Sequence, residues 1–345
     1  MLIVGLRGDS LIEWQCGESD LLIDESGNPF PSFEYEGKSY PRTSNRSWQL
    51  FRTTPVVDTA TRILAISDIH GEFDHLTAFL RKVGVVDSNL QWTWGDGQLV
   101  VVGDIFDRGA QVTECLWLLY RLQAEARRAR GDVHLLLGNH ELMVMRGDLR
   151  YVNEKYTEGV VKRTGISYSE LYGSDSELGR WLRSLNAMMR INDLLFVHGG
   201  IAPWLTESGL TLEQINDSVR FAIDVTRDSL TERPFPRRLY GTDGPFWYRG
   251  FHYGLEGKYP AATSEELDRM LARFDVEVCV VGHTEVDSIT ALFDGRVVAV
   301  DVPVEERDGL EGLLWEDGRA YRVTASGRRV PLVLHRRAPG KSGSN

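Results

Sequence analysis

The sequence predicts an α/β protein, because short apolar runs typical of buried strands alternate with amphipathic segments typical of helices. Five of these runs are partly β-branched and apolar on both faces, as expected for strands covered on both sides of a sheet. They are RILAISDIHG, QLVVVGDIFDRG, VHLLLGNHE, DLLFVHGG and VEVCVVGHTE. Each run ends in a small residue followed by polar side chains. Because ligands of α/β proteins gather at the carboxyl ends of strands, we expect the functional site at these five ends.

The segments around these runs complete the predicted elements. Residues 1–60 mix short apolar runs with Gly, Pro and Ser, which indicates a β-rich N-terminal extension without a separate core. Residues 72–84 and 265–274 place apolar side chains at helical spacing. The charged, helix-like stretch 142–190 interrupts the strand pattern, so we expect it to be a helical insertion that packs over one edge of the site.

The C-terminal part has a different pattern. Residues 286–335 contain alternating segments with turn signals at Asp294-Gly295 and Asp317-Gly318, which predict antiparallel strands of a second sheet. Residues 336–345 are basic, small and polar, and we expect them to be disordered.

Composition narrows the class of protein. The formal net charge of −11 and the pI near 5.3 argue against a nucleic-acid partner, since phosphate contacts need a basic face. No apolar stretch approaches the ~20 residues that span a bilayer, and the first residues lack the pattern of a signal peptide. Three widely separated cysteines favour a reduced, cytoplasmic setting. We therefore expect a cytoplasmic protein without a nucleic-acid or membrane partner.

The strand ends carry metal-ligand chemistry. Carboxylate, imidazole and amide groups are the ligands that a borderline divalent metal accepts. Any one histidine is more often an ordinary buried polar residue, but the same chemistry at five independent strand ends indicates a metal site. The residues concerned are Asp68, His70, Asp104, Asn139, His140, His198 and His283.

The motifs SDIHG, GDIFDRG, GNHE, HGG and GHT, in this order, resemble the phosphoprotein-phosphatase branch of the calcineurin-like metallophosphoesterases. GDLRY (147–151) and GPFWYRG (244–250) look more particularly like the bacterial-type, Shewanella-like protein phosphatases. Ser67 stands where the family usually has Gly, and Glu285 stands where broader superfamily members have a second His. The resemblance implies a four-layer α/β/β/α sandwich with two mixed sheets, formed by a metallophosphatase domain over residues 61–335.

The resemblance also implies two divalent metal ions, with manganese, iron or zinc as the expected metals. The first ion would be held by Asp68, His70 and Asp104. Asp104 would bridge to the second ion, whose other ligands would be Asn139, His198 and His283. Two such ions lower the pKa of a bridging water and stabilise both oxygens of an in-line displacement.

The remaining polar residues have roles around the phosphoryl group. Arg108 and Arg249 would bind phosphate through their planar guanidinium groups, together with Asn139. His140 is the candidate general acid for the leaving oxygen, and Asp107 would orient it through the other ring nitrogen.

The expected function is hydrolysis of phosphomonoesters on phosphoproteins or phosphopeptides, by direct attack of a metal-bridging hydroxide on phosphotyrosine, phosphoserine or phosphothreonine. Two alternatives stay open: a diadenosine polyphosphate hydrolase on the same fold, and a non-catalytic scaffold that binds phosphoproteins. Trp247 and Tyr248 could pack under a lid or stack on a phosphotyrosine ring. The spacing of Cys115 and Arg121 matches cysteine-dependent phosphatases, but the apolar residues between them predict a buried helix instead.

Overall fold

The computed structural model describes residues 54–225, 234–304 and 309–335, together with the backbone of four short strands nearer the N-terminus. These strands form two antiparallel pairs: β1 (Leu2–Arg7) with β2 (Ser10–Gln15), and β3 (Ser32–Tyr35) with β4 (Lys38–Pro41). The tail predicted at residues 336–345 lies outside the described residues.

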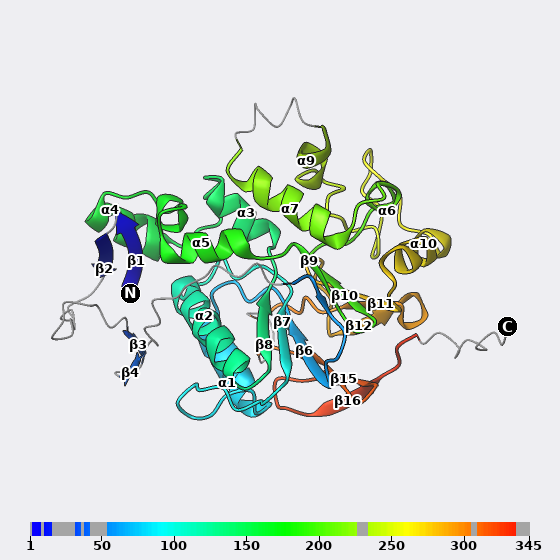
Figure 1. Cartoon of the computed structure of the whole chain (residues 1–345), viewed down its shortest axis with the longest axis horizontal. Coiled ribbons are helices and arrows are strands. Elements are labelled where there is room, and N and C mark those ends of the chain that lie inside the picture. Colours follow the sequence, from blue (N-terminus) through cyan, green and yellow to red (C-terminus); the bar gives the residue numbers. More distant parts are fainter. Residues whose placement is uncertain are drawn as a thin grey trace.

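Two six-stranded sheets form the centre of the fold (Figure 1). One contains β5 (Val56–Val57), β9 (Met188–Ile191), β10 (Leu194–Val197), β11 (Val278–Val281), β12 (Thr290–Leu292) and β13 (Val297–Ala299). The other contains β6 (Arg62–Ile66), β7 (Gln98–Val101), β8 (Asp132–Leu135), β14 (Gly312–Glu316), β15 (Arg319–Val323) and β16 (Arg329–Leu332). Their orders are β12-β13-β11-β10-β9-β5 and β16-β15-β14-β6-β7-β8. The five strands predicted from the apolar runs are confirmed as β6, β7, β8, β10 and β11.

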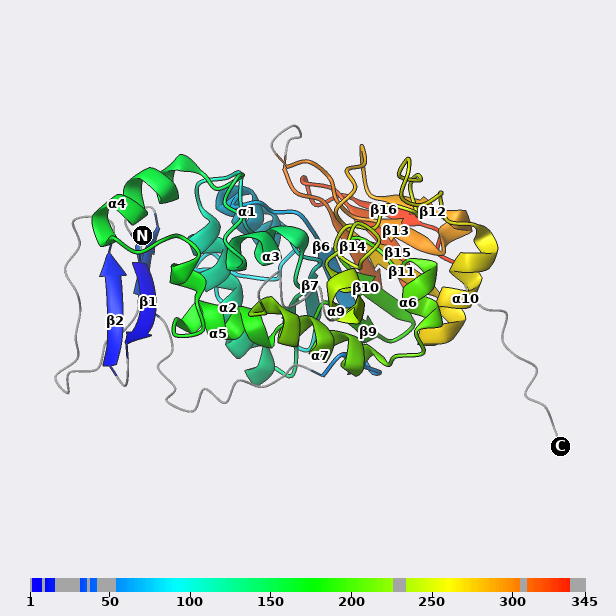
Figure 2. The same cartoon turned by 90° about the horizontal axis from the view of Figure 1, so that it is seen from above.

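Alternating side chains of the strands face two different cores, which produces four layers. Ile63 of β6 and Val280 of β11 belong to the apolar core between the sheets. Their neighbours Leu64 and Val281 belong to the core beneath the helices. Helices α1 (Phe73–Lys82) and α2 (Val112–Arg128) cover the second sheet, and α7 (Leu212–Ile223) and α10 (Ser264–Phe274) lie on the first (Figures 1 and 2). The predicted α/β/β/α sandwich is confirmed.

The helices predicted from apolar spacing are present as α1 and α10. Thr263 starts α10, since its hydroxyl accepts a hydrogen bond from the Glu266 amide at 3.2 Å, and the Glu266 carboxylate accepts one from the Thr263 amide at 2.8 Å. The other α-helices among the described residues are α3 (Asn139–Met145), α4 (Val161–Thr164), α5 (Glu177–Ser184), α6 (Pro203–Glu207) and α9 (Pro234–Leu239). No helix in the described ranges is both long and apolar enough to cross a membrane.

The C-terminal strands differ from the prediction that they share one sheet. Strand β13 pairs in parallel with β11, with Cys279 opposite Val297, so the β12–β13 pair extends the first sheet. Strand β14 instead pairs antiparallel with β6, with Leu313 opposite Ala65, and β14–β16 extend the second sheet. The three residues of β13 are all buried, so its sequence pattern carried no signal for one sheet over the other.

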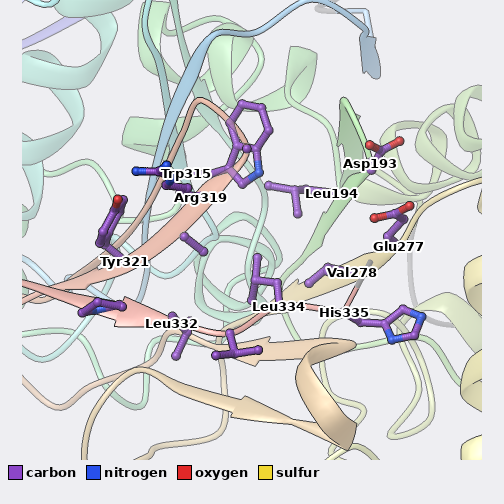
Figure 3. Close-up of a pocket in the computed structure, with 14 residues that line it drawn as sticks. Asp193, Leu194, Glu277, Val278, Trp315, Arg319, Tyr321, Leu332, Leu334 and His335 are labelled. Atoms are coloured by element: carbon purple, nitrogen blue, oxygen red, sulfur yellow. The ribbon is translucent and has the colours of Figure 1, made fainter. Parts of the chain in front are cut away.

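A groove of about 600 Å³ opens at the edge of the sandwich where β10 and β11 begin (Figure 3). Its lining includes Asp193 and Glu277, which precede these two strands, and Trp315 and Tyr321 from the second sheet. The predicted ligands follow the opposite, carboxyl ends of β10 and β11. The groove is therefore separate from the candidate site.

Candidate metal centre

The chain topology brings the polar strand ends to one edge of the sandwich. Strands β6, β7 and β8 run parallel to one another, and β10 runs parallel to β11, so the carboxyl ends within each sheet lie together. Backbone hydrogen bonds join the loops that follow these strands. The amide of His70 donates to the carbonyl of Asp104 at 3.0 Å, and the amide of Gly282 donates to the carbonyl of His198 at 2.8 Å. Across the two sheets, the carboxylate of Asp68 accepts a hydrogen bond from the His283 amide, and that of Asp104 lies 3.2 Å from His198, so both sheets contribute side chains to one site.

Two groups of metal-binding side chains share a single carboxylate. His70, Asp104 and His140 form one group, and Asp104, His198 and His283 form the other. All five residues are buried. Oδ2 of Asp104 lies 3.2 Å from Nε2 of His198 and 3.9 Å from Nε2 of both His70 and His140. Asp104 is therefore the one residue common to both groups.

Asp68 and Asn139 adjoin the same groups. Oδ1 of Asn139 lies 2.8 Å from Nε2 of His198. Oδ2 of Asp68 accepts a hydrogen bond from the backbone amide of His283 at 3.1 Å and another from the Ser67 hydroxyl. The hydroxyl present at Ser67 thus contacts a predicted ligand directly, which a Gly at this position could not do.

Backbone carbonyls fix two histidine rings in the tautomer that suits metal binding. Nδ1 of His70 donates to the carbonyl of Phe106, and Nδ1 of His198 donates to that of Val102, both at 2.7 Å. Neutral rings held in this way direct the lone pair of Nε2 into the site. The Nε2 of His283 is buried and has no hydrogen-bond partner among the described residues. These nitrogens fit a bound cation.

The acceptor atoms around His198 also require a positive charge. Its Nε2 faces the oxygens of both Asp104 and Asn139, an arrangement that only a proton or a metal ion can stabilise. Burial alone would lower the pKa of His198, but Asp104 and Asp68 raise it to about 10. The donor set therefore fits a divalent cation in both chemistry and charge.

His140, a member of the first group, also forms a buried pair with Asp107. Nδ1 of His140 lies 2.5 Å from Oδ2 of Asp107, and the backbone amide of His140 donates to Oδ1 of Asp104 at 3.0 Å. Burial lowers the pKa of His140, but Asp104 and Asp107 outweigh this and raise it above its usual value. This pairing stabilises the protonated form of the imidazole.

Sequence reasoning assigned no role to Glu141, which organises the loop after β7. Its carboxylate accepts hydrogen bonds from four backbone amides, those of Ile105 (2.7 Å), Gly138 (2.6 Å), Asp104 (2.9 Å) and Phe106 (3.3 Å). Burial, with a further contribution from Asp104, raises the pKa of Glu141 to about 7. The only sequence signal was the last letter of GNHE.

The backbone at the site is strained. Six non-glycine residues around the centre have positive φ angles between 47° and 71°, a region that such residues rarely adopt. They are Asp68, His70, Asp104, Asp107, Arg108 and His283. Contacts such as the four backbone hydrogen bonds to the Glu141 carboxylate stabilise these loops against that strain.

Both predicted phosphate-binding arginines lie beside the centre. The half-exposed Arg108 has its Nη1 3.6 Å from Oε1 of Glu285. Nη1 of Arg249 donates to the carbonyl of His283 at 2.8 Å and to the hydroxyl of Thr284 at 3.1 Å.

Three further residues refine the predicted site. Tyr248 is buried, so it cannot stack on a substrate, whereas Trp247 is partly exposed and its ring lies edge-on to that of His283 at 5.5 Å. Asp301 is a buried carboxyl that the motifs missed, and its pKa is raised first by burial and then by Asp68. It follows the run VVAV at the end of β13, which is a sixth strand end of the predicted kind.

Comparison with known proteins identifies the class of protein. The profile of calcineurin-like phosphoesterases matches residues 61–287. The chain belongs to the calcineurin-like phosphoesterase family and is a metallophosphoesterase, a hydrolase homologous to protein phosphatases.

Individual relatives show which members of the family this chain is similar to. It is 26% identical over 343 residues to Shewanella-like protein phosphatase 2 of Arabidopsis thaliana, covering 87% of this chain and 85% of that protein. A cold-active protein-tyrosine phosphatase of a psychrophilic Shewanella species superposes with a TM-score of 0.82 at 34% identity, over 96% of this chain and 99% of that one. A symmetrical bis(5'-nucleosyl)-tetraphosphatase of Neisseria meningitidis is 33% identical over 140 residues, which make up 40% of this chain and 43% of that protein. These matches confirm the resemblance to Shewanella-like protein phosphatases.

Proposed function

We propose that the chain is a metal-dependent phosphoprotein phosphatase that hydrolyses phosphomonoesters of tyrosine, or of serine and threonine, with residues 61–335 as its catalytic domain. One observation supports the proposal: His140, which belongs to one of the two groups that share Asp104, also pairs with the buried Asp107. A proton donor next to a cation site is what cleavage of a phosphomonoester needs, so this pairing supports the proposed role of His140.

The proposed metal ligands differ from the two groups in three residues: Asp68 and Asn139 are added, and His140 is kept as the proton donor. Asp68, His70 and Asp104 would hold one divalent ion, and Asp104, Asn139, His198 and His283 would hold the other, with manganese, iron or zinc as candidates. When bound, the ions supply positive charge and a water of lowered pKa.

The chain's own residues bind and protonate the substrate. Arg108, Arg249 and Asn139 bind the phosphoryl oxygens, because their side chains lie at the edges of the centre. His140 donates its Nε2 proton to the leaving oxygen, and Asp107 holds the ring in position through Nδ1.

The nature of the relatives supports a phosphoprotein substrate. The two protein phosphatases match most of this chain, whereas the dinucleotide hydrolase matches less than half. A dinucleotide substrate is therefore the second candidate. The complete set of ligand-type side chains argues against a scaffold, which does not need them. Both described cysteines are buried and unpaired, and the cytoplasm stays the expected compartment.

The test is phosphate release by manganese-loaded protein from matched phosphotyrosine and phosphothreonine peptides and from diadenosine tetraphosphate, with Asp104→Asn in parallel. We expect metal-dependent release from a phosphopeptide that the substitution abolishes. Turnover of the dinucleotide alone would establish the second candidate. Two bound metal ions without turnover of any substrate would contradict the proposal.

A further inference from the structure

Tyr151 combines solvent exposure with contact to the proposed general acid. Its side chain is 50% exposed, although its ring centroid lies only 5.4 Å from that of His140. Exposed large apolar or aromatic side chains are few among the described residues, and the others are Phe221, Tyr253 and Val333. Of these four, only Tyr151 has a ring contact with a histidine of the centre.

Neighbouring groups hold Tyr151 in position. Its carbonyl accepts a hydrogen bond from the backbone amide of Arg108 at 2.9 Å, so it is linked to a proposed phosphate-binding residue. The guanidinium of Arg150 lies 5.5 Å from the ring centroid. Two 2.8 Å hydrogen bonds to Asp148 in turn fix that guanidinium. An aromatic ring held in this way offers a ready surface for a second ring.

We infer that Tyr151 selects aromatic leaving groups by stacking on the phenyl ring of a phosphotyrosine. The inference rests on the proposed function, and in particular on His140 as the proton donor. The leaving oxygen must come within hydrogen-bond reach of His140, so the group attached to that oxygen extends into the space beside it. Tyr151 is the exposed ring at that place. The side chain of a phosphothreonine has no ring and is too small to stack on the ring of Tyr151.

The partly exposed Trp247 has its ring contact with His283 and not with His140. His283 also accepts a hydrogen bond from the proposed phosphate-binding residue Arg249, through its backbone carbonyl. A contribution from Trp247 would therefore affect all phosphomonoesters equally. Discrimination between leaving groups belongs to Tyr151.

The experiment compares kcat/KM for phosphotyrosine and phosphothreonine in one peptide sequence, using wild type, Tyr151→Phe, Tyr151→Ala and Tyr253→Ala. We expect Tyr151→Ala to reduce the preference for phosphotyrosine about 2- to 12-fold, the range for one aromatic pair. Tyr151→Phe should keep the preference, because stacking needs the ring and not the hydroxyl. Tyr253 is the matched control, as it is 48% exposed and its replacement should leave the preference unchanged.

A binding measurement makes the test independent of slow phosphothreonine turnover. Phenylphosphonate should bind wild type more tightly than methylphosphonate, and Tyr151→Ala should narrow that ratio of Kd values by the same factor. Equal losses on both peptides, an unchanged preference in Tyr151→Ala, or an equal effect of Tyr253→Ala would overturn the inference. Failure of wild type to hydrolyse either peptide would instead refute the proposed function itself.

Discussion

Asp107 acts on the proposed reaction through His140, because its Oδ2 is hydrogen-bonded to Nδ1 of His140 at 2.5 Å. Together with Asp104, it raises the pKa of His140 against the effect of burial. Replacing Asp107 by Asn removes that charge, so His140 loses its proton at lower pH. We expect kcat to fall roughly 10- to 100-fold and the alkaline limb of its pH profile to move to lower pH, with little change in KM. An unchanged pH profile would show that Asp107 does not position the acid.

Glu141 stabilises the loop after β7 by accepting four backbone hydrogen bonds. In Glu141→Gln one of the two acceptor oxygens becomes an amide group, which leaves buried N–H groups unpaired. We expect the free energy of unfolding in urea to fall by at least about 1–3 kcal/mol. Glu316→Gln is the control, because Glu316 pairs with the half-exposed Arg329, and its loss should cost less than about 1 kcal/mol. Equal effects of the two variants would refute this role.

The sequence predicted the metal-ligand candidates but not the residues that hold them. Asp68, His70 and Asp104 follow apolar runs in recognisable motifs, so their chemistry is visible within a few residues. The contact of Glu141 with Asp104 joins positions 37 residues apart. The proximity of Tyr151 to His140 likewise depends on how the chain returns after α3. No local pattern encodes such contacts.

At the scale of elements, the junction between β8 and α3 leaves no room for a side chain at Gly138. A Cβ there would come within 2.6 Å of the backbone nitrogen of Asp104 and would also clash with its carboxylate. We expect Gly138→Ala to weaken metal binding and to destabilise the fold by about 1–3 kcal/mol, measured by metal titration and urea unfolding. Gly159→Ala is the control, since nothing lies within 4 Å of its added Cβ. A stable Gly138→Ala that binds metal normally would contradict this packing.

Elements were predictable to different degrees. Helices α1 and α10 have the apolar spacing of one buried face, and the strands before the motifs are continuous apolar runs. The assignment of the C-terminal hairpins to two sheets was not predictable. All residues of strand β13 are buried, so its own sequence does not show which sheet it joins. Its place is set by pairing with β11, a strand from a different part of the chain.

At the scale of the whole molecule, the proposed ligands come from both sheets, so bound metal should stabilise their packing. Binding to the native state alone adds roughly 2.7 kcal/mol when free metal is 100 times its Kd. We expect a chelator to lower the Tm by several degrees in calorimetry. Asp104→Asn, which lacks the shared carboxylate, should show a much smaller shift. Identical melting of wild type with and without chelator would contradict a metal site between the sheets.

The order of the strands has a consequence for synthesis of the chain on the ribosome. Every proposed ligand has been translated once His283 is made, yet β6, which precedes Asp68 and His70, receives its second neighbour only when β14 (Gly312–Glu316) appears. Until then β6 is an open edge, free to pair with another chain. A nascent chain thus carries all the ligands before it has the sheet that holds them. A chain ending at Val300 should therefore fail to bind metal in a titration, although it lacks none of the ligands.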